Sequence, residues 1–231
     1  MNYREQQKRR AAWEAVKQVR SGMVIGLGTG STAMWALKRL AERLSTGAIT
    51  KVCGVPSSLD TADSAARLGI PLTDLAHHPL LDLTIDGADE VDPDLNLIKG
   101  GGGALLREKV LAQASRRNII IVDESKLSSH LGSRHSLPVE VTPFARNCIE
   151  RYLVSLGAEV NARESDAGTL FQTDQENLIL DADFGPIFDP HDLAAKLADR
   201  AGIVAHGLFI ELADEVIVAE DERVRHLHRP A

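Results

Sequence analysis

Apolar residues gather in short runs along the first half of the chain. The mostly apolar runs at 23–27 and 118–122 predict buried strands, the run at 51–55 predicts a third strand, and the alternating pattern at 81–85 predicts a fourth. Buried strands of this kind are typical of parallel sheets, which need a helix to connect each strand to the next. The pattern therefore predicts helices between these runs.

Helical periodicity does separate the predicted strands. Apolar residues recur at helical spacing over residues 4–20, and Gly22 ends that predicted helix. The other predicted elements of this half are helices at 33–40, at 57–67 with Ser57 as its cap and from 104 onward, and a short strand at 70–72. Strands that alternate with helices predict an α/β, Rossmann-like open sheet with helices on both faces.

The pattern changes in the second half, where strands follow one another. Strands are predicted at 137–141, 158–162, 169–173 and 178–180, and helices at 144–156 and 191–200. This order indicates an α+β unit of the ferredoxin-like kind. A last strand at 215–218 is expected to return to the first sheet. We therefore predict a catalytic domain over 1–131 and 208–231 that carries an inserted domain over 132–207.

A lysine, four consecutive glycines and a glutamate fall within residues 99–108, at the predicted start of a helix. Consecutive glycines cost conformational entropy, so this loop is expected to bring its backbone close to a ligand or to turn its N–H groups toward an anion. Glu108 falls one helical turn beyond the glycines. A carboxylate there predicts acid–base chemistry on an anionic substrate, and a flexible surface loop is the alternative.

A second glycine-rich turn, Gly-Thr-Gly-Ser-Thr at 28–32, joins a predicted strand to a predicted helix. Such a junction presents N–H groups and hydroxyls to a phosphate. The dinucleotide fingerprint would need glycine at Ser31, and a Walker loop would need Gly-Lys-Ser/Thr, so NAD and ATP are disfavoured and a smaller phosphorylated molecule is favoured. A tight turn with Ser31 as helix cap is the alternative.

An acidic cluster at 86–92 follows the predicted strand at 81–85. Ligands of open α/β sheets bind at the carboxyl ends of the strands, where this cluster falls. A calcium loop that began at Asp86 would need an acid or an amide at its third position and a glutamate at its twelfth, where this chain has Ala88 and Leu97. Calcium binding is therefore disfavoured. A solvated acidic loop is the alternative, and Lys126, after the next strand, is a candidate cation for the same site.

Composition narrows the function classes. The chain has 231 residues, 44% of them apolar, and a formal net charge of -7, which leaves no basic surface for nucleic acid. Cys53 and Cys148 lie far apart and indicate a reducing compartment. No apolar stretch is long enough to span a bilayer, so a cytoplasmic protein with no membrane partner is expected. The tail 226–230 is expected to be frayed.

The motifs at 28–32, 86–90, 99–108 and 125–126 occur in an order that closely resembles ribose-5-phosphate isomerases of the A type, and the likeness runs nearly end to end. The resemblance implies interconversion of ribose 5-phosphate and ribulose 5-phosphate in the non-oxidative pentose phosphate pathway, by a homodimer, without cofactor or metal. It implies catalytic roles for Glu108 as proton acceptor and for Asp86, Asp89 and Lys99. It places substrate contacts on Thr29, Gly30, Ser31, Thr32, Asp86, Gly87, Ala88, Asp89, Lys99, Gly100, Gly101, Gly102 and Lys126.

Two departures from the family pattern are local. Many members carry Asn-Gly in the hairpin before Leu178, where this chain has Gln175 and Glu176, so the turn geometry is open. The segment after Phe209 also differs from the family pattern, so the resemblance does not predict the last strand or any contact of the C-terminus.

Aldose–ketose isomerisation moves a proton between adjacent carbons through an enediol. The reaction needs a base, a group that shuttles hydroxyl protons and a group that stabilises the oxyanion. Glu108, Asp86 or Asp89, and Lys99 with the glycine amides supply these parts. Two rivals stay open: a regulator that senses a sugar phosphate, which should carry a helix-turn-helix or basic face, and a CoA transferase, in which the glutamate would be a nucleophile.

Overall fold

The computed structural model describes residues 3–221 and 223–229. Contacts divide the chain into two compact units. Unit 1 comprises Met1–Ala88, Arg107–Lys126 and Glu211–Ala231, and unit 2 comprises Asp89–Leu106 and Leu127–Ile210. The domain boundaries predicted above, 1–131 with 208–231 and 132–207, stay a prediction. Within the described residues, no helix has the length and apolar character to cross a membrane.

Unit 1 is built on a six-stranded sheet with the order β13-β12-β6-β3-β1-β2. Its strands are β1 (Val24–Leu27), β2 (Cys53–Pro56), β3 (Leu83–Asp86), β6 (Asn118–Asp123), β12 (Glu215–Glu220) and β13 (Arg223–His228). The first five pair in parallel, and β13 is antiparallel to β12. The predicted open α/β sheet is thus confirmed, as is the return of residues 215–218 to it.

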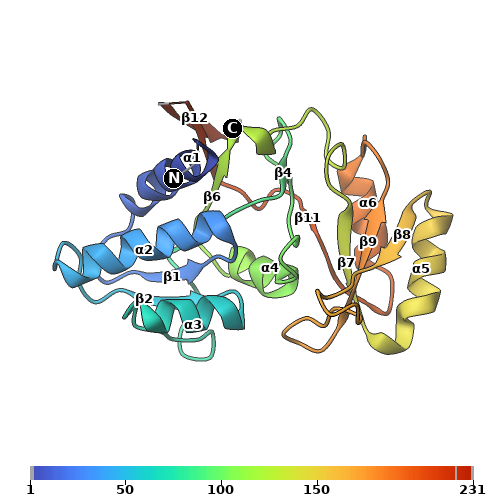
Figure 1. Ribbon diagram of the computed structural model, residues 1–231, viewed down its shortest axis with the longest axis horizontal. Coiled ribbons are helices and arrows are strands. Elements are labelled where there is room, and N and C mark those ends of the chain that lie inside the picture. The colour runs from blue at the N-terminus through green and yellow to red at the C-terminus, as the bar shows by residue number, and fades with distance from the viewer. Residues whose placement is uncertain (1–2, 222, 230–231) are drawn as a thin grey trace. The chain divides into compact units, whose positions relative to one another are not determined.

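Helices pack on both faces of this sheet (Figure 1). Ile25, Leu27 and Ile119 belong to a core cluster with apolar residues of α1 (Tyr3–Val16) and α2 (Ser31–Ser45). The alternate positions of the strands face the other way, where Val55 packs with Leu111 of α4 (Leu105–Gln113). The remaining helix is α3 (Leu59–Arg67), and a 3-10 turn, η1 (Glu124–Lys126), follows β6.

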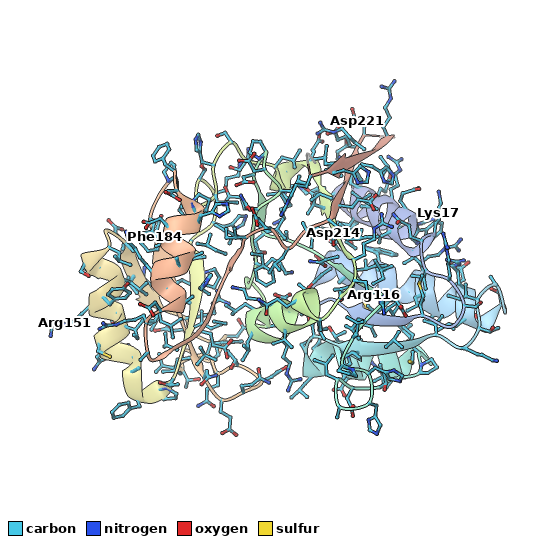
Figure 2. The ribbon with its side chains drawn as sticks, turned by 180° about the vertical axis from the view of Figure 1, so that it is seen from behind. Lys17, Arg116, Arg151, Phe184, Asp214 and Asp221 are labelled. Carbon is cyan, nitrogen blue, oxygen red and sulfur yellow. The ribbon has the colours of Figure 1, made fainter. Side chains whose placement is uncertain are left out.

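The entry into β12 is fixed by one carboxylate. Asp214, labelled in Figure 2, accepts the backbone N–H of Asn118 at 2.7 Å, and its own N–H donates to the Asn118 carbonyl at 3.0 Å. These reciprocal bonds align the starts of β12 and β6, two strands that are distant in sequence.

The expectation of a frayed tail is wrong for residues 226–228. They belong to β13, which pairs along its length with β12, and Val224 packs against the core of unit 1. His226 also contacts the buried carboxylate of Glu215 through Nδ1. The mostly polar composition of the tail hides this strand from a reading of the sequence. Pro230 lies outside the described residues.

Three local predictions in unit 1 are corrected. The first helix ends at Val16, because Lys17 and Gln18 form the tighter bonds of a turn and Val19 is buried beyond it. The cap of α3 is Ser58, whose Oγ accepts the N–H of Thr61 at 3.0 Å. The expected strand at 70–72 is reduced to a single bridge.

Unit 2 contains a four-stranded antiparallel sheet with the order β10-β7-β9-β8. Its strands are β7 (Leu137–Val141), β8 (Glu159–Ala162), β9 (Leu178–Asp183) and β10 (Ile203–His206), with α5 (Arg146–Ser155) between β7 and β8 and α6 (Pro190–Ala198) between β9 and β10. A 3-10 turn, η2 (Pro143–Ala145), precedes α5. This β-α-β-β-α-β order is the ferredoxin-like arrangement that was predicted (Figure 1).

A small antiparallel sheet in unit 2 flanks the four consecutive glycines, residues 100–103, which are called the glycine loop below. Its strands, in the order β11-β5-β4, are β4 (Glu90–Val91), β5 (Leu97–Ile98) and β11 (Leu208–Phe209). Because β5 ends at Ile98, the chain enters residues 99–103 from a paired strand.

The segment predicted as a strand at 169–173 makes only isolated bridges. It leads into a hairpin in which the N–H of Thr173 donates to the Asn177 carbonyl and the N–H of Glu176 donates to the Thr173 carbonyl, both at 2.9 Å. Glu176 has φ of 61°. This is a three-residue loop with a left-handed third residue, the position at which glycine is favoured.

Candidate active site

The first glycine-rich turn forms the junction that the sequence predicts. β1 leads directly into Gly28, and α2 begins at Ser31. The cap of α2 is Gly30, with φ of 105° and no side-chain cap, rather than Ser31. The N–H groups of the first turn of α2 are therefore not covered by a capping side chain, which suits an anion-binding helix start.

Ser31 is held by a hydrogen-bonded group of side chains from α1 and α2. Lys8 Nζ donates to Ser31 Oγ at 3.0 Å and pairs with Glu5 at 2.9 Å. Trp35 Nε1, one turn into α2, donates to the other oxygen of Glu5 at 2.9 Å. The hydrogen bond from Lys8, with that from Trp35, holds the pKa of the Glu5 carboxyl below its usual value. The start of α2 is thus fixed to α1.

The hydroxyl of Thr29 belongs to a cluster of four hydroxyls. Its Oγ1 lies 2.7 Å from Ser57 Oγ, 2.9 Å from Ser58 Oγ and 3.0 Å from Thr61 Oγ1. This cluster joins the turn after β1 to the turn after β2. A cavity of about 300 Å³ lies beside it, lined by Gly28, Gly30, Ser31, Met34, Leu37, Asp60 and Thr61.

Asp86 is the last residue of β3 and is 2% exposed. Its Oδ1 accepts the N–H of Thr29 at 3.1 Å and the N–H of Gly87 at 2.7 Å. The carboxylate therefore connects the turn at 28–32 to the acidic loop, as expected for neighbouring parallel strands that end at the same edge.

Lys126 lies in η1, after the carboxyl end of β6. The start of η1 is held by Asp123, which accepts the N–H of Ser125 at 3.0 Å and is also bonded by the Ser125 hydroxyl. Because β6 is parallel to β3, Lys126 follows the same edge of the sheet as Asp86.

In unit 2, the glycine loop is closed by backbone bonds. The N–H of Gly103 donates to the Gly100 carbonyl at 3.0 Å, and these two glycines have φ of 82° and 104°. The N–H of Gly101 donates to Asp89 Oδ2 at 2.8 Å. A Cβ at Gly101 would stand 2.9 Å from Asp89 Oδ1. Glycine suits the left-handed conformations of Gly100 and Gly103, and at Gly101 it permits the close approach of the Asp89 carboxylate.

Lys99 precedes the loop and is 3% exposed. Its N–H donates to the Gly207 carbonyl at 2.9 Å, and its Nζ lies 5.5 Å from the centre of the Phe209 ring. A lysine held over an aromatic face has a location that suits the stabilisation of an oxyanion.

Glu108 lies in the first turn of α4 and is 5% exposed. Burial lowers the pKa of its neighbour Lys109 to about 7. A buried carboxyl group one helical turn beyond a glycine loop has a location that suits a general base. Lys109 was not singled out by the sequence, where it reads as an ordinary helix former.

The structure places the predicted site residues on both units. Unit 1 carries Thr29, Gly30, Ser31, Thr32, Asp86, Gly87, Ala88, Glu108 and Lys126, and unit 2 carries Asp89, Lys99, Gly100, Gly101 and Gly102. Within unit 1, Asp86 and Thr29 are bonded to each other, and within unit 2, Asp89 and Gly101 are bonded. The hydroxyls of Ser57, Ser58 and Thr61 were not predicted as part of the site, although the Ser-Ser-x-x-Thr spacing after a strand was visible.

Unit 1 has a parallel sheet with an uncapped helix start at its carboxyl edge and a buried glutamate, and unit 2 has a buried lysine before a glycine loop. Each set of features is typical of enzymes that act on small phosphorylated metabolites. Residues 53–223 match the family described as ribose 5-phosphate isomerase A (phosphoriboisomerase A). The chain belongs to this family, whose members interconvert ribose 5-phosphate and ribulose 5-phosphate.

The similarity extends over nearly the whole chain. This chain is 54% identical over 220 residues to ribose-5-phosphate isomerase A of Desulfatibacillum aliphaticivorans, and the match covers 95% of this chain and 96% of the relative. It is 56% identical over 223 residues to that of Chloroflexus aurantiacus, covering 96% and 93%. A solved D-ribose-5-phosphate isomerase in complex with phospho-erythronic acid superposes with a TM-score of 0.96 at 40% identity, covering 99% of this chain and all of that one.

Proposed function

We propose that this chain interconverts ribose 5-phosphate and ribulose 5-phosphate by metal-independent proton transfer through an enediol, with Glu108 as the base. The observation that carries the proposal is the burial of Glu108 one turn after the glycine loop. Glu108 takes the proton from C2 of the aldose and returns it to C1 of the ketose, so no net proton is consumed. A carboxylate base without a metal also serves triosephosphate isomerase, on another fold.

The other groups have separate tasks. Lys99 and the Gly102 amide stabilise the negative oxygen of the enediolate, whereas the Gly101 amide holds Asp89. Asp86 and Asp89 accept backbone N–H groups of the two loops, and we propose that either one shuttles the hydroxyl protons. Phospho-erythronic acid, bound to the related isomerase, carries a carboxylate that resembles the enediolate, and we propose it as an inhibitor of this chain.

We propose that Thr29, Gly30, Ser31, Thr32 and Lys126 bind the phosphate, with further substrate contacts from Gly87 and Ala88. Because Ser31 is the first residue of α2 and its hydroxyl is 3.0 Å from Lys8 Nζ, Ser31→Ala should raise KM for ribose 5-phosphate about tenfold, with kcat within about twofold. Steady-state kinetics is the measurement. Thr46→Ala, at the far end of α2, is the control; an unchanged KM in Ser31→Ala would contradict the assignment.

The test of the function is an assay for ketose after ribose 5-phosphate is added to the enzyme pre-treated with EDTA. We expect full turnover after chelation and far weaker turnover of free ribose, which cannot use the phosphate contacts. Loss of activity with EDTA and rescue by a divalent ion would remove the metal-free mechanism. A transferase of CoA would instead give a glutamyl thioester that hydroxylamine traps.

We further propose that the chain acts as a cytoplasmic homodimer in the non-oxidative pentose phosphate pathway. This rests on the family and on the absence of a membrane-spanning helix among the described residues. Light scattering at working concentration should give about twice the 25.0 kDa chain mass; a species of the single-chain mass would overturn the dimer.

A further inference from the structure

The glycine loop of unit 2 is held from one side by a single guanidinium. Arg163 directly follows β8, outside every motif discussed above. Its Nη1 donates to the carbonyl oxygens of Gly100 at 2.8 Å and of Gly101 at 3.1 Å. These two carbonyls belong to the peptides whose amides the proposed mechanism uses.

Arg163 is itself held in place. Its Nε donates to Asp181 Oδ2 at 2.9 Å, and its Nη2 pairs with the other oxygen of Asp181. Its backbone N–H donates to the Ile179 carbonyl, and its carbonyl accepts the N–H of Phe171, both at 2.9 Å. The side chain is only 15% exposed. One edge of the guanidinium therefore binds the carboxylate and leaves Nη1 for the loop, a geometry that lysine cannot reproduce.

The contact determines where the loop amides point. A trans peptide is planar, so its N–H points away from its C=O. Because the carbonyls of Gly100 and Gly101 face Arg163, the N–H groups of Gly101 and Gly102 face the opposite side. The Gly101 N–H donates there to Asp89. Within residues 3–221 and 223–229, the Gly102 N–H has no protein acceptor.

We propose that Arg163 is a positioning residue for the isomerisation: by holding the carbonyls of Gly100 and Gly101, it aims the Gly102 amide at the enediolate oxygen. The inference rests on the proposed function and adds a residue to it. The guanidinium also polarises both peptides, which makes their N–H groups stronger donors. Asp181 sets the orientation of Arg163 and therefore acts on the glycine loop indirectly, through Arg163.

The test is steady-state kinetics of Arg163→Gln and Arg163→Lys. Removal of one oxyanion donor costs about 10²–10³-fold in kcat, so misaiming a donor should cost about 10–100-fold, with KM for ribose 5-phosphate within about threefold. Lysine keeps the charge but loses the fork, so both variants should fall in this range. Inhibition by inorganic phosphate, which reports the turn at 28–32, should be unchanged, while inhibition by phospho-erythronic acid should weaken in parallel with kcat.

Arg200→Gln is the matched control, since Arg200 belongs to the same unit but stacks on Tyr152. Asp181→Asn keeps the shape and loosens Arg163, so it should lower kcat less than Arg163→Gln and add little in the double variant. Should Arg163→Gln fail to fold, this milder variant carries the test. Wild-type kcat in the folded variants, or a loss confined to KM, would overturn the inference. An inactive wild type would instead overturn the proposed function.

Discussion

Replacing Glu108 by glutamine should lower kcat by about 10²–10⁴-fold, the usual contribution of a general base, with KM little changed. The amide has nearly the shape of the carboxylate, so the buried first turn of α4 should keep its packing. It cannot accept the C2 proton. Steady-state kinetics with ribose 5-phosphate, alongside thermal unfolding to confirm the fold, is the measurement.

Glu150→Gln on α5 is the matched control, because it makes the same chemical change in a helix of unit 2 that is remote in sequence from the glycine loop. Its kcat should equal that of the wild type. An independent readout is isomerisation in D₂O, in which a base that exchanges with solvent places deuterium on the transferred carbon. Near-full turnover of Glu108→Gln would remove Glu108 as the base, and transfer with no exchange at slow turnover would favour a hydride shift.

The parts of the fold that could be predicted are those encoded over short distances. The turn at 28–32 follows a buried apolar run and precedes a helical one, so its chemistry and position are visible within ten or so residues. The same holds for Asp86 at the end of β3. Ser58 rather than Ser57 caps α3 because Ser57 still belongs to the sheet edge, where its N–H donates to the Leu27 carbonyl at 2.9 Å.

Features that depend on distant contacts could not be predicted. Arg163 bonds to a loop more than sixty residues earlier in the chain, and nothing in its local sequence distinguishes it from a surface arginine. The fold of the tail depends on β12, which supplies the partner strand for β13. Glu108 was identified from its place after the glycines, but its burial follows from packing that periodicity alone does not reveal.

Gly28→Ala should disable the enzyme through sterics alone. An added Cβ would stand 2.6 Å from the Cα of Asp86, a backbone atom that cannot move aside without shifting β3. Overpacking of this kind costs about 1–3 kcal/mol of stability. Asp86 also accepts the N–H of Thr29, so the same shift would displace both the turn at 28–32 and the start of the acidic loop at residue 86. A misplacement of about 1 Å can cost about 10²-fold in rate, so kcat/KM should fall at least that far in the protein that stays folded.

Gly69→Ala separates this effect from backbone strain. Gly69 has φ of 73° and open space around its Cα, so alanine there meets no neighbour but adopts a left-handed conformation, which costs about 1–2 kcal/mol. Denaturant unfolding should therefore show comparable losses of stability for the two variants, whereas isomerase kinetics should show loss of activity only for Gly28→Ala. If Gly28→Ala kept wild-type kcat/KM, the close packing of Gly28 on Asp86 would not be needed for catalysis, and the proposed anion-binding role of this turn would have to be reassigned.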